Sequence, residues 1–233
     1  MSRASRRPLW TERLDRAAVA AFGAIWLLAC GRLLPSITEL SLLWPIGAGI
    51  MAGYLLADFL SGAVHWLADR YFAPTTWLIG PLLIAPFREH HADATEIARH
   101  DFFEISGNSA LVSLPLVAGL LALPLPSEAA LGSLSPALLA GLHGLGVGST
   151  AALFLTNQLH GWAHRADPPA AVGRLQAWGW ILSPQRHALH HRHHDRAYCV
   201  TSGWLNPWLD RMRFFPTLER LVDRLRAPRR RPT

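Results

Sequence analysis

The chain has 233 residues, of which 51% are hydrophobic and only 16% charged, and a formal net charge of +6 at pH 7. This composition is too apolar for an average soluble domain and favours integration into a membrane. All 22 basic residues are arginines that flank apolar runs and do not alternate with aromatic residues, a pattern that argues against a nucleic-acid partner.

Four apolar segments are each long enough to cross a bilayer, since about 20 helical residues span a hydrocarbon core of about 30 Å. We expect these spans near residues 17–34, 39–59, 109–125 and 134–157. Around them we distinguish a basic cytoplasmic N-terminal arm (1–16), a membrane domain (17–215) and a basic C-terminal tail (216–233). The sequence therefore predicts an all-α, polytopic integral membrane protein with about four transmembrane helices.

The arginines predict the orientation of these spans. The two expected external loops, 35–39 and 125–133, contain no arginine, whereas 60–108 and the region after 157 contain many, which places the latter two in the cytoplasm. Eleven of the twelve histidines fall in these two cytoplasmic segments. We therefore expect a cytoplasmic, histidine-rich, metal-binding cap. His143, inside the fourth span, is the exception and is expected to be a helix-packing residue or to make an interhelical hydrogen bond.

The end of the second span carries the first candidate site, Asp58-x6-His65-x3-Asp69. His65 and Asp69 are four residues apart and so lie on one helix face. An acid beside a histidine at the membrane edge is a candidate functional group, because a carboxylate is costly to bury there without a partner. The alternative is a structural ion pair of Asp69 with Arg70 or Arg88.

The segment FREHHADATEIARHDFFE (87–104) carries the adjacent pair His90 and His91, followed by His100. Adjacent histidines on a helix point about 100° apart, so they can serve two metal ions, or one ion and a supporting contact. A solvated polar helix is the alternative, because charges of both signs are frequent in this segment.

Two further histidine clusters follow the fourth span. His160 and His164, just after Asn157, have the i, i+4 spacing of a bidentate metal clamp. The segment PQRHALHHRHHD (184–195) aligns His187, His190 and His191 along a helix. Imidazole suits iron, zinc and copper alike, so the ligand type does not select the metal. A surface tract that binds metal adventitiously is the alternative for the last cluster.

At these motifs the chain resembles the plasmanylethanolamine desaturase family, also called the Kua or CarF family. The resemblance rests on DFLSGAVHWLAD (58–69), the 87–104 segment, NQLHGWAH (157–164), and PQRHALHH followed by YCVTSGWLN (184–206). It implies that 17–215 is a lipid desaturase domain with a di-metal centre. The implied metal ligands are His65, His90, His91, His160, His164, His187, His190 and His191. His100, Asp69 and Asn157 are implied as a ninth ligand or as supporting groups, and Arg88 and Arg186 are weaker candidates for the lipid headgroup.

The resemblance also implies the chemistry. Two iron ions, which zinc can replace in purified samples, would use O2 and two electrons to convert an alkyl ether phospholipid into its 1'-alkenyl (vinyl ether) form, a plasmalogen. No flavin or nicotinamide fingerprint is present, so a separate protein, cytochrome b5 or a ferredoxin-like carrier, is expected to supply electrons. A bacterial inner membrane is the expected location, or the endoplasmic reticulum in a eukaryote. A lipid hydroxylase and a non-catalytic, metal-binding regulatory protein are the two alternatives.

Overall fold

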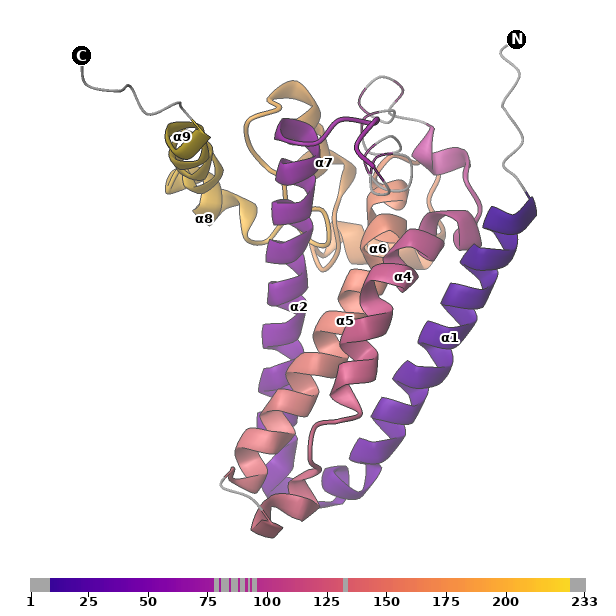
Figure 1. Ribbon diagram of the computed structural model, residues 1–233, viewed down its shortest axis with the longest axis vertical. Helices are drawn as coiled ribbons and strands as arrows, with labels where there is room; N and C mark the ends of the chain where they lie inside the picture. The colour runs from indigo at the N-terminus through magenta and orange to yellow at the C-terminus, as the bar shows by residue number, and fades with distance from the viewer. Residues whose placement is uncertain are drawn as a thin grey trace.

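The computed structural model describes residues 9–77, 80, 84, 88, 91, 93, 96–131 and 134–226, with Ala130 and Leu131 described by their backbone alone. The described residues form helices and no strand (Figure 1). In chain order these are α1 (Leu9–Leu33), η1 (Leu34–Thr38), α2 (Leu40–Arg70), η3 (Ile97–Arg99), α4 (Phe102–Leu120), η4 (Pro126–Leu131), α5 (Pro136–Ala163), α6 (Ala170–Ala177), α7 (Pro184–Arg192), α8 (Asn206–Arg211) and α9 (Phe214–Arg226). The η elements are short 3₁₀ helices.

Four segments are long and apolar enough to cross a membrane, and they confirm the predicted fold class. They are Leu9–Thr38, Leu40–Arg70, Phe102–Leu120 and Pro136–Ala163. The chain is thus an integral membrane protein built on four long helices. The second and fourth spans run eleven and six residues beyond the ends predicted at 59 and 157, because the apolar run stops at the first polar residues while the helical hydrogen bonds continue. α9 occupies 216–226 of the predicted tail.

α2 and α5 pack closely enough that their backbones touch. A Cβ atom added at Gly53 of α2 would lie 2.6 Å from the Ser149 amide nitrogen, and one at Gly148 of α5 would lie 2.5 Å from the Ile50 carbonyl oxygen. Real Cβ atoms do not approach so closely, so glycine is required at both contacts. At these contacts the two helices run side by side with no room for a third component between them.

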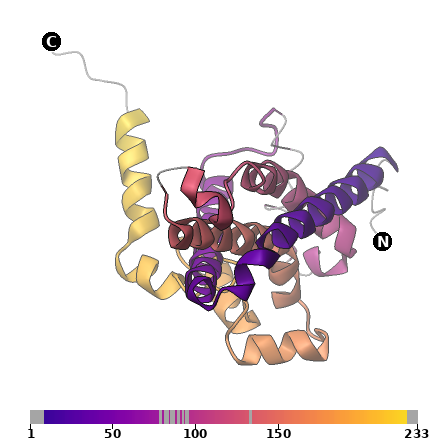
Figure 2. The same ribbon diagram turned by 90° about the horizontal axis from the view of Figure 1, so that it is seen from below.

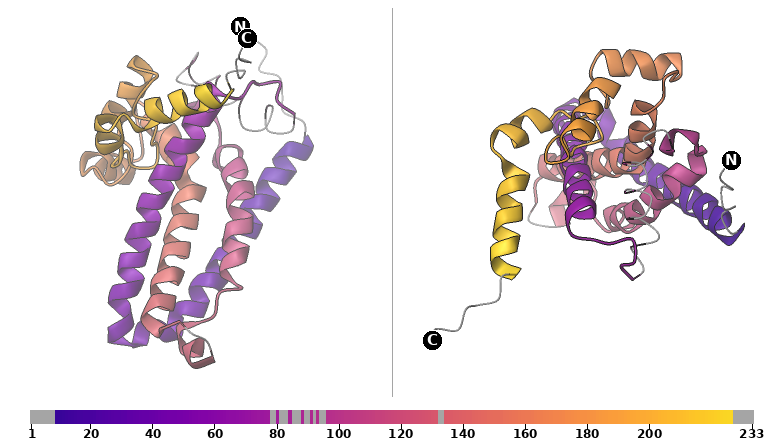
Figure 3. Two further views of the ribbon diagram at one scale, coloured as in Figure 1. Left: turned by 60° about the vertical axis from the view of Figure 1, so that its left-hand side comes forward. Right: turned by 90° about the horizontal axis from the view of Figure 1, so that it is seen from above.

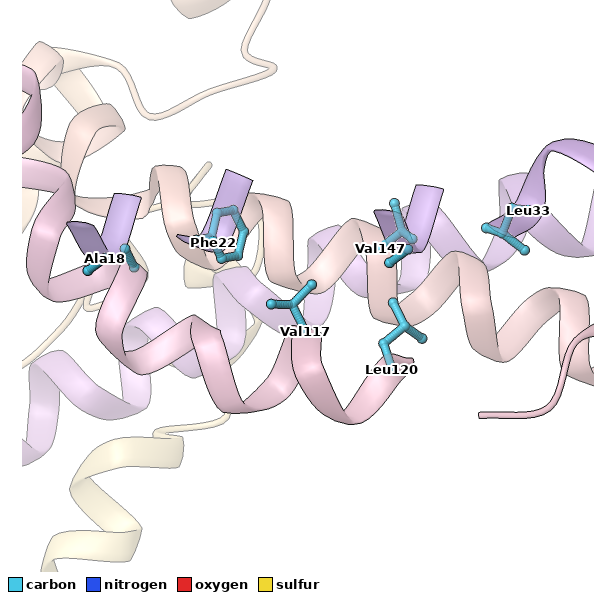
Figure 4. Packing of buried hydrophobic residues seen from close by; sticks show 8 residues of the cluster. Ala18, Phe22, Leu33, Val117, Leu120 and Val147 are labelled. Atoms are coloured by element: carbon cyan, nitrogen blue, oxygen red, sulfur yellow. The ribbon is translucent and has the colours of Figure 1, made fainter. Parts of the chain in front are cut away.

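α1 and α4 complete the bundle through an apolar cluster shared with α5 (Figure 4). Phe22 of α1 is only 3% exposed and stacks on Phe154 of α5 with ring centroids 4.4 Å apart, while Val117 of α4 is fully buried. Figure 2, a view along the bundle, shows α1 crossing the bundle on the side away from α9. Packing of this apolar cluster fixes the positions of the spans that carry the functional groups above it.

One end of the bundle carries α6 to α9, and the opposite end carries η1 and η4 (Figures 1 and 3). At the η4 end, His143 Nε2 lies 2.9 Å from the Pro124 carbonyl oxygen, so this histidine forms a hydrogen bond, but with the connection between α4 and η4 and not with a second helix. At the other end, α9 lies across the axes of the spans, beside the last turns of α2 (Figure 3). Its Phe215 packs with Trp66 and Tyr198 in a buried cluster.

The segment 197–206, which is non-helical up to Leu205, lies against α2 and is held there by buried polar side chains. Asp58, fully buried in α2, accepts hydrogen bonds from the amides of Ser202 (2.7 Å), Gly203 (2.9 Å) and Leu205 (3.1 Å). Ser61 Oγ accepts from the Val200 amide at 3.0 Å. Non-helical backbone at membrane depth is tolerated only when the protein satisfies its polar groups. Asp58 therefore has a structural partner, which explains an acid inside an apolar span.

Candidate metal centre

Most of the predicted ligands converge at the end of the bundle that carries α7. They come from the last turns of α2 and α5, from α7, and from His91 in the connection between α2 and α4. They form two sets, which we call the four-histidine group and the aspartate-containing group. The four-histidine group consists of His160, His164, His187 and His191. The aspartate-containing group consists of His65, Asp69, His91 and His190.

In the four-histidine group the Nε2 atoms point toward one another. His187 Nε2 lies 2.8 Å from His160 Nε2 and 2.9 Å from the Nε2 atoms of His164 and His191. His160 and His164, one turn apart at the end of α5, have their Nε2 atoms 3.3 Å apart. His160 and His187 are almost fully buried.

This convergence fits a cation better than hydrogen bonding. Each Nε2 carries either one hydrogen or one lone pair, so His187 Nε2 can form one hydrogen bond and cannot serve three neighbours. Ligand nitrogens about 2.0–2.1 Å from one metal ion would lie about 3.3–3.4 Å apart in tetrahedral geometry and about 2.9 Å apart in octahedral geometry. The observed separations fall close to these values, so the donor set fits a metal ion.

The protein keeps these imidazoles in the form that binds metal. Burial, together with a smaller effect of the neighbouring histidines, lowers the pKa of His164 to about 4 and that of His191 to about 3. Burial likewise lowers the pKa of His187 well below its ordinary value. All three rings are therefore neutral at pH 7, with a lone pair available for coordination.

The aspartate-containing group joins three imidazoles to one carboxylate. Asp69 Oδ2 lies 3.5 Å from Nε2 of both His65 and His190, and Asp69 Oδ1 lies 3.6 Å from His91 Nε2. The Nε2 atoms of His65 and His190 each lie 3.4 Å from His91 Nε2. His65 and Asp69, one turn apart on α2, thus lie beside each other and meet side chains from two other segments.

The tautomers of two of these histidines follow from their other ring nitrogens. Nδ1 of His65 faces the Tyr198 carbonyl oxygen at 3.1 Å, and Nδ1 of His190 faces the Arg196 carbonyl oxygen at 2.8 Å. A carbonyl only accepts, so both Nδ1 atoms donate, and the neutral form of either ring would then present its lone pair at Nε2, toward Asp69. Asp69 Oδ2 is buried and forms no hydrogen bond with the described residues. Lone pairs facing a carboxylate repel unless a cation lies between them, which makes this group a fit for a metal ion as well.

The two groups are direct neighbours. The ring centroids of His65 and His160 are 6.0 Å apart, and those of His91 and His191 are 5.3 Å apart. α7 supplies both groups, because His187 and His191 turn to one side while His190 turns to the other. The arrangement can therefore hold two ions within one shared, largely buried site.

The remaining predicted site residues have different surroundings. His90 lies outside the described residues. His100 Nε2 lies 3.1 Å from Glu96 Oε1, and its Nδ1 lies 3.7 Å from Glu104 Oε1, so its described contacts are with carboxylates. His100 does not belong to the two groups found among the described residues, and Asn157 lies partly buried in α5, three residues before His160. Asp58, the acid that begins the first motif, supports the 197–206 segment instead.

A cavity of about 290 Å³ opens beside the aspartate-containing group and is lined by Asp69, Arg70, Arg88, His91 and His194. One nitrogen of Arg88 donates to the carbonyl oxygens of Phe72 (2.7 Å) and Asp69 (3.3 Å), which leaves it at the cavity wall. Arg186 instead donates to the carbonyl oxygens of Gly179 and Ser202, both at 3.0 Å. The two arginines predicted at the headgroup thus occupy different settings.

The family is shown by comparison with known proteins. The model of the lipid desaturase domain matches residues 54–232, which include every ligand of both groups. The chain belongs to the lipid desaturase domain family. No solved structure matches it significantly.

Three relatives show what this chain is similar to. It is 41% identical over 182 residues to the plasmanylethanolamine desaturase of Myxococcus xanthus and 40% identical over 187 residues to plasmanylethanolamine desaturase 1 of Mus musculus. It is 34% identical over 171 residues to the chloroplastic fatty acid desaturase 4 of Arabidopsis thaliana. These matches cover 77%, 76% and 72% of this chain but 61%, 65% and 49% of the relatives. The resemblance read from the motifs is confirmed.

Proposed function

We propose that this protein is an O2-dependent di-iron desaturase that forms the 1'-alkenyl double bond of plasmalogens from alkyl ether phospholipids. The observation that carries the proposal is the pair of adjacent ligand groups, seven histidines and one aspartate, at the end of a four-helix membrane bundle. Membership of the lipid desaturase family and the names of the two relatives at 40% and 41% identity support this reaction above other histidine-metal chemistry.

In the overall reaction, an –O–CH2–CH2– unit loses two hydrogens and becomes –O–CH=CH–. O2 takes up these two hydrogens together with two electrons and two protons, and two water molecules result. Iron ions held by the two groups would supply the O2 activation that removal of hydrogen from an unactivated carbon requires. The described ligands for them are His160, His164, His187 and His191 in one group and His65, Asp69, His91 and His190 in the other. His90 remains a predicted ligand.

The protein's own contribution is to hold ligands and substrate in place. The carbonyl oxygens of Tyr198 and Arg196 fix the rings of His65 and His190, so these ligands need no reorientation during turnover. Burial of the two groups excludes bulk water and so protects a reactive centre from side reactions. A substrate bound at one fixed depth then presents the same two carbons in every cycle.

The cavity beside the aspartate-containing group suits a phosphate headgroup. Arg70 and Arg88 both line it, and guanidinium groups bind phosphate oxygens through paired N–H donors. The bonds of Arg88 to two carbonyl oxygens occupy one of its nitrogens, and a guanidinium carries five N–H donors. The glycine contacts between α2 and α5 leave no room for a hydrocarbon chain, so we place the alkyl chain outside that interface.

The arginine distribution supports a cytoplasmic position of the ligand groups. A bacterial inner membrane remains our proposed location, and a ferredoxin-like carrier or cytochrome b5 our proposed electron donor. Either electron donor would reach the metal centre from the cytoplasm, on the side where α6 to α9 lie.

The test is lipid analysis in cells that lack plasmalogens and are supplied with alkyl ether phospholipids. Three proteins are expressed with a competent electron donor: the parent, His187→Ala, and His193→Ala as a matched control. His193 is exposed and belongs to neither ligand group. We expect acid-labile vinyl ethers, detected by mass spectrometry, with the parent and with His193→Ala, and none with His187→Ala. Hydroxylated ether lipids without vinyl ethers, or no modified lipid from well-expressed parent, would refute the proposal.

A further inference from the structure

The short stretch Arg196–Tyr198 contacts the aspartate-containing group through its backbone. The Arg196 carbonyl oxygen accepts a hydrogen bond from His190 Nδ1 at 2.8 Å, and the Tyr198 carbonyl oxygen accepts one from His65 Nδ1 at 3.1 Å. Two carbonyls only two residues apart in the chain thus hold histidines from α7 and α2. Both histidines belong to the same ligand group. The conformation of this stretch therefore sets the orientation of two ligands at once.

The residue between these carbonyls has an unusual backbone conformation. Ala197 has φ = 57°, in the left-handed region that is unfavourable for a residue with a Cβ atom. It is 2% exposed, so its surroundings must hold it in place. A residue in this region persists only where neighbouring structure determines its conformation, and such positions often serve function.

α8 supplies the contacts that hold the stretch. Asp210 Oδ1 accepts a hydrogen bond from the Ala197 amide at 3.2 Å. One turn earlier on α8, the Asn206 side chain accepts from the Cys199 amide at 2.8 Å and donates to the Cys199 carbonyl oxygen at 3.0 Å. The side chains of Asn206 and Asp210 therefore form hydrogen bonds with the backbone on either side of Tyr198.

We propose that Asp210 is a positioning residue for the aspartate-containing group. It holds the Ala197 amide, and so keeps the Arg196 and Tyr198 carbonyl oxygens on the Nδ1 atoms of His190 and His65. This inference rests on the proposed metal centre and adds a residue outside it. Without the carboxylate, Ala197 loses the contact that offsets its unfavourable φ, and the two carbonyls turn away from the rings. The rings then lose their fixed tautomer and direction, and the ion in this group is held less firmly.

The experiment measures the release of zinc from purified, zinc-loaded full-length protein in detergent, after addition of a chromogenic chelator. Parent protein is expected to release two zinc ions in two kinetic phases. His187→Ala, which disrupts the four-histidine group, identifies the phase that belongs to the aspartate-containing group. Asp210→Ala should accelerate that phase roughly 10- to 100-fold and leave the other unchanged.

Two further variants separate positioning from a general loss of structure. Asp210→Asn keeps an oxygen that can accept from the Ala197 amide, so it should restore the slow release. Asp195→Ala removes a carboxylate from the same region, where Asp195 is exposed and contacts the Arg196 side chain, and should behave as the parent. If Asp210→Ala does not fold, Asp210→Glu, which displaces the oxygen, replaces it in the comparison.

Equal acceleration of both phases, or no acceleration of either, would overturn the positioning role of Asp210. Failure of Asp210→Asn to restore slow release would also overturn it. A parent protein that binds no zinc is a different result, because it would overturn the metal centre itself.

Discussion

Replacement of Asp58 by alanine tests whether the 197–206 segment depends on a single buried carboxylate. The side chain is fully buried and accepts hydrogen bonds from three backbone amides at 2.7, 2.9 and 3.1 Å. A buried donor left without a partner costs about 1–3 kcal/mol. Three such donors would therefore cost roughly 3–9 kcal/mol, which is comparable with the total stability of about 5–15 kcal/mol that native proteins have. We expect Asp58→Ala to be folded poorly or not at all.

The assay is thermal unfolding in detergent, followed by tryptophan fluorescence, with metal content measured on the same samples. Asp58→Asn keeps one acceptor oxygen and should lie between the parent and Asp58→Ala. Asp101→Ala is the control, because Asp101 caps α4 at an exposed position and accepts one hydrogen bond, from the Glu104 amide at 3.0 Å. Loss of this capping hydrogen bond should lower the free energy of unfolding by only about 1 kcal/mol. An Asp58→Ala protein as stable as the Asp101→Ala protein would refute the reasoning, since water would then be satisfying the three amides.

Three further outcomes are expected. His187→Ala should bind one metal ion fewer per chain than the parent by elemental analysis, because its Nε2 contacts the Nε2 atoms of all three other members of its group; an unchanged metal content would contradict the four-histidine group. Gly53→Ala should lower the free energy of unfolding by about 1–3 kcal/mol or more, because its Cβ atom would lie 2.6 Å from the Ser149 amide nitrogen. The control Gly23→Ala, whose Cβ atom would have nothing within 4 Å, should be as stable as the parent or slightly more stable. Similar thermal unfolding of both variants would argue against close α2–α5 packing. Ala197→Gly should raise the unfolding temperature, because glycine avoids a cost of about 1–2 kcal/mol at positive φ; a fall would mean that the conformation carries no such cost.

The sequence predicted the features that depend on local spacing. Apolar runs gave four spans, and the i, i+4 pairs His65–Asp69 and His160–His164 each lie within one ligand group of the structure. These features were accessible because helix geometry alone brings such residues together.

Features that depend on distant contacts could not be read from the sequence. The HxxHH pattern gave three histidines on α7, but not that His190 faces one group while His187 and His191 face the other. Asp58 looked like part of the site because it shares a helix with His65, yet its partners lie 144 to 147 residues away in the chain. Only packing of the last segment against α2 reveals which polar residues bind the backbone and which face the centre.

The same long separations govern when the protein can mature during synthesis. His65 is made early, but the carbonyl that orients it belongs to a residue 133 positions later, and His190 joins it from a helix of the same late segment. Ribosomes deliver the N-terminal part of a chain first, so α2 enters the membrane with an acid and a histidine whose partners have not yet been translated. Neither ligand group can therefore form before α7 has been made, and a chain truncated before α8 would contain all four spans and still lack the Asn206 and Asp210 side chains that hold Ala197 and Cys199.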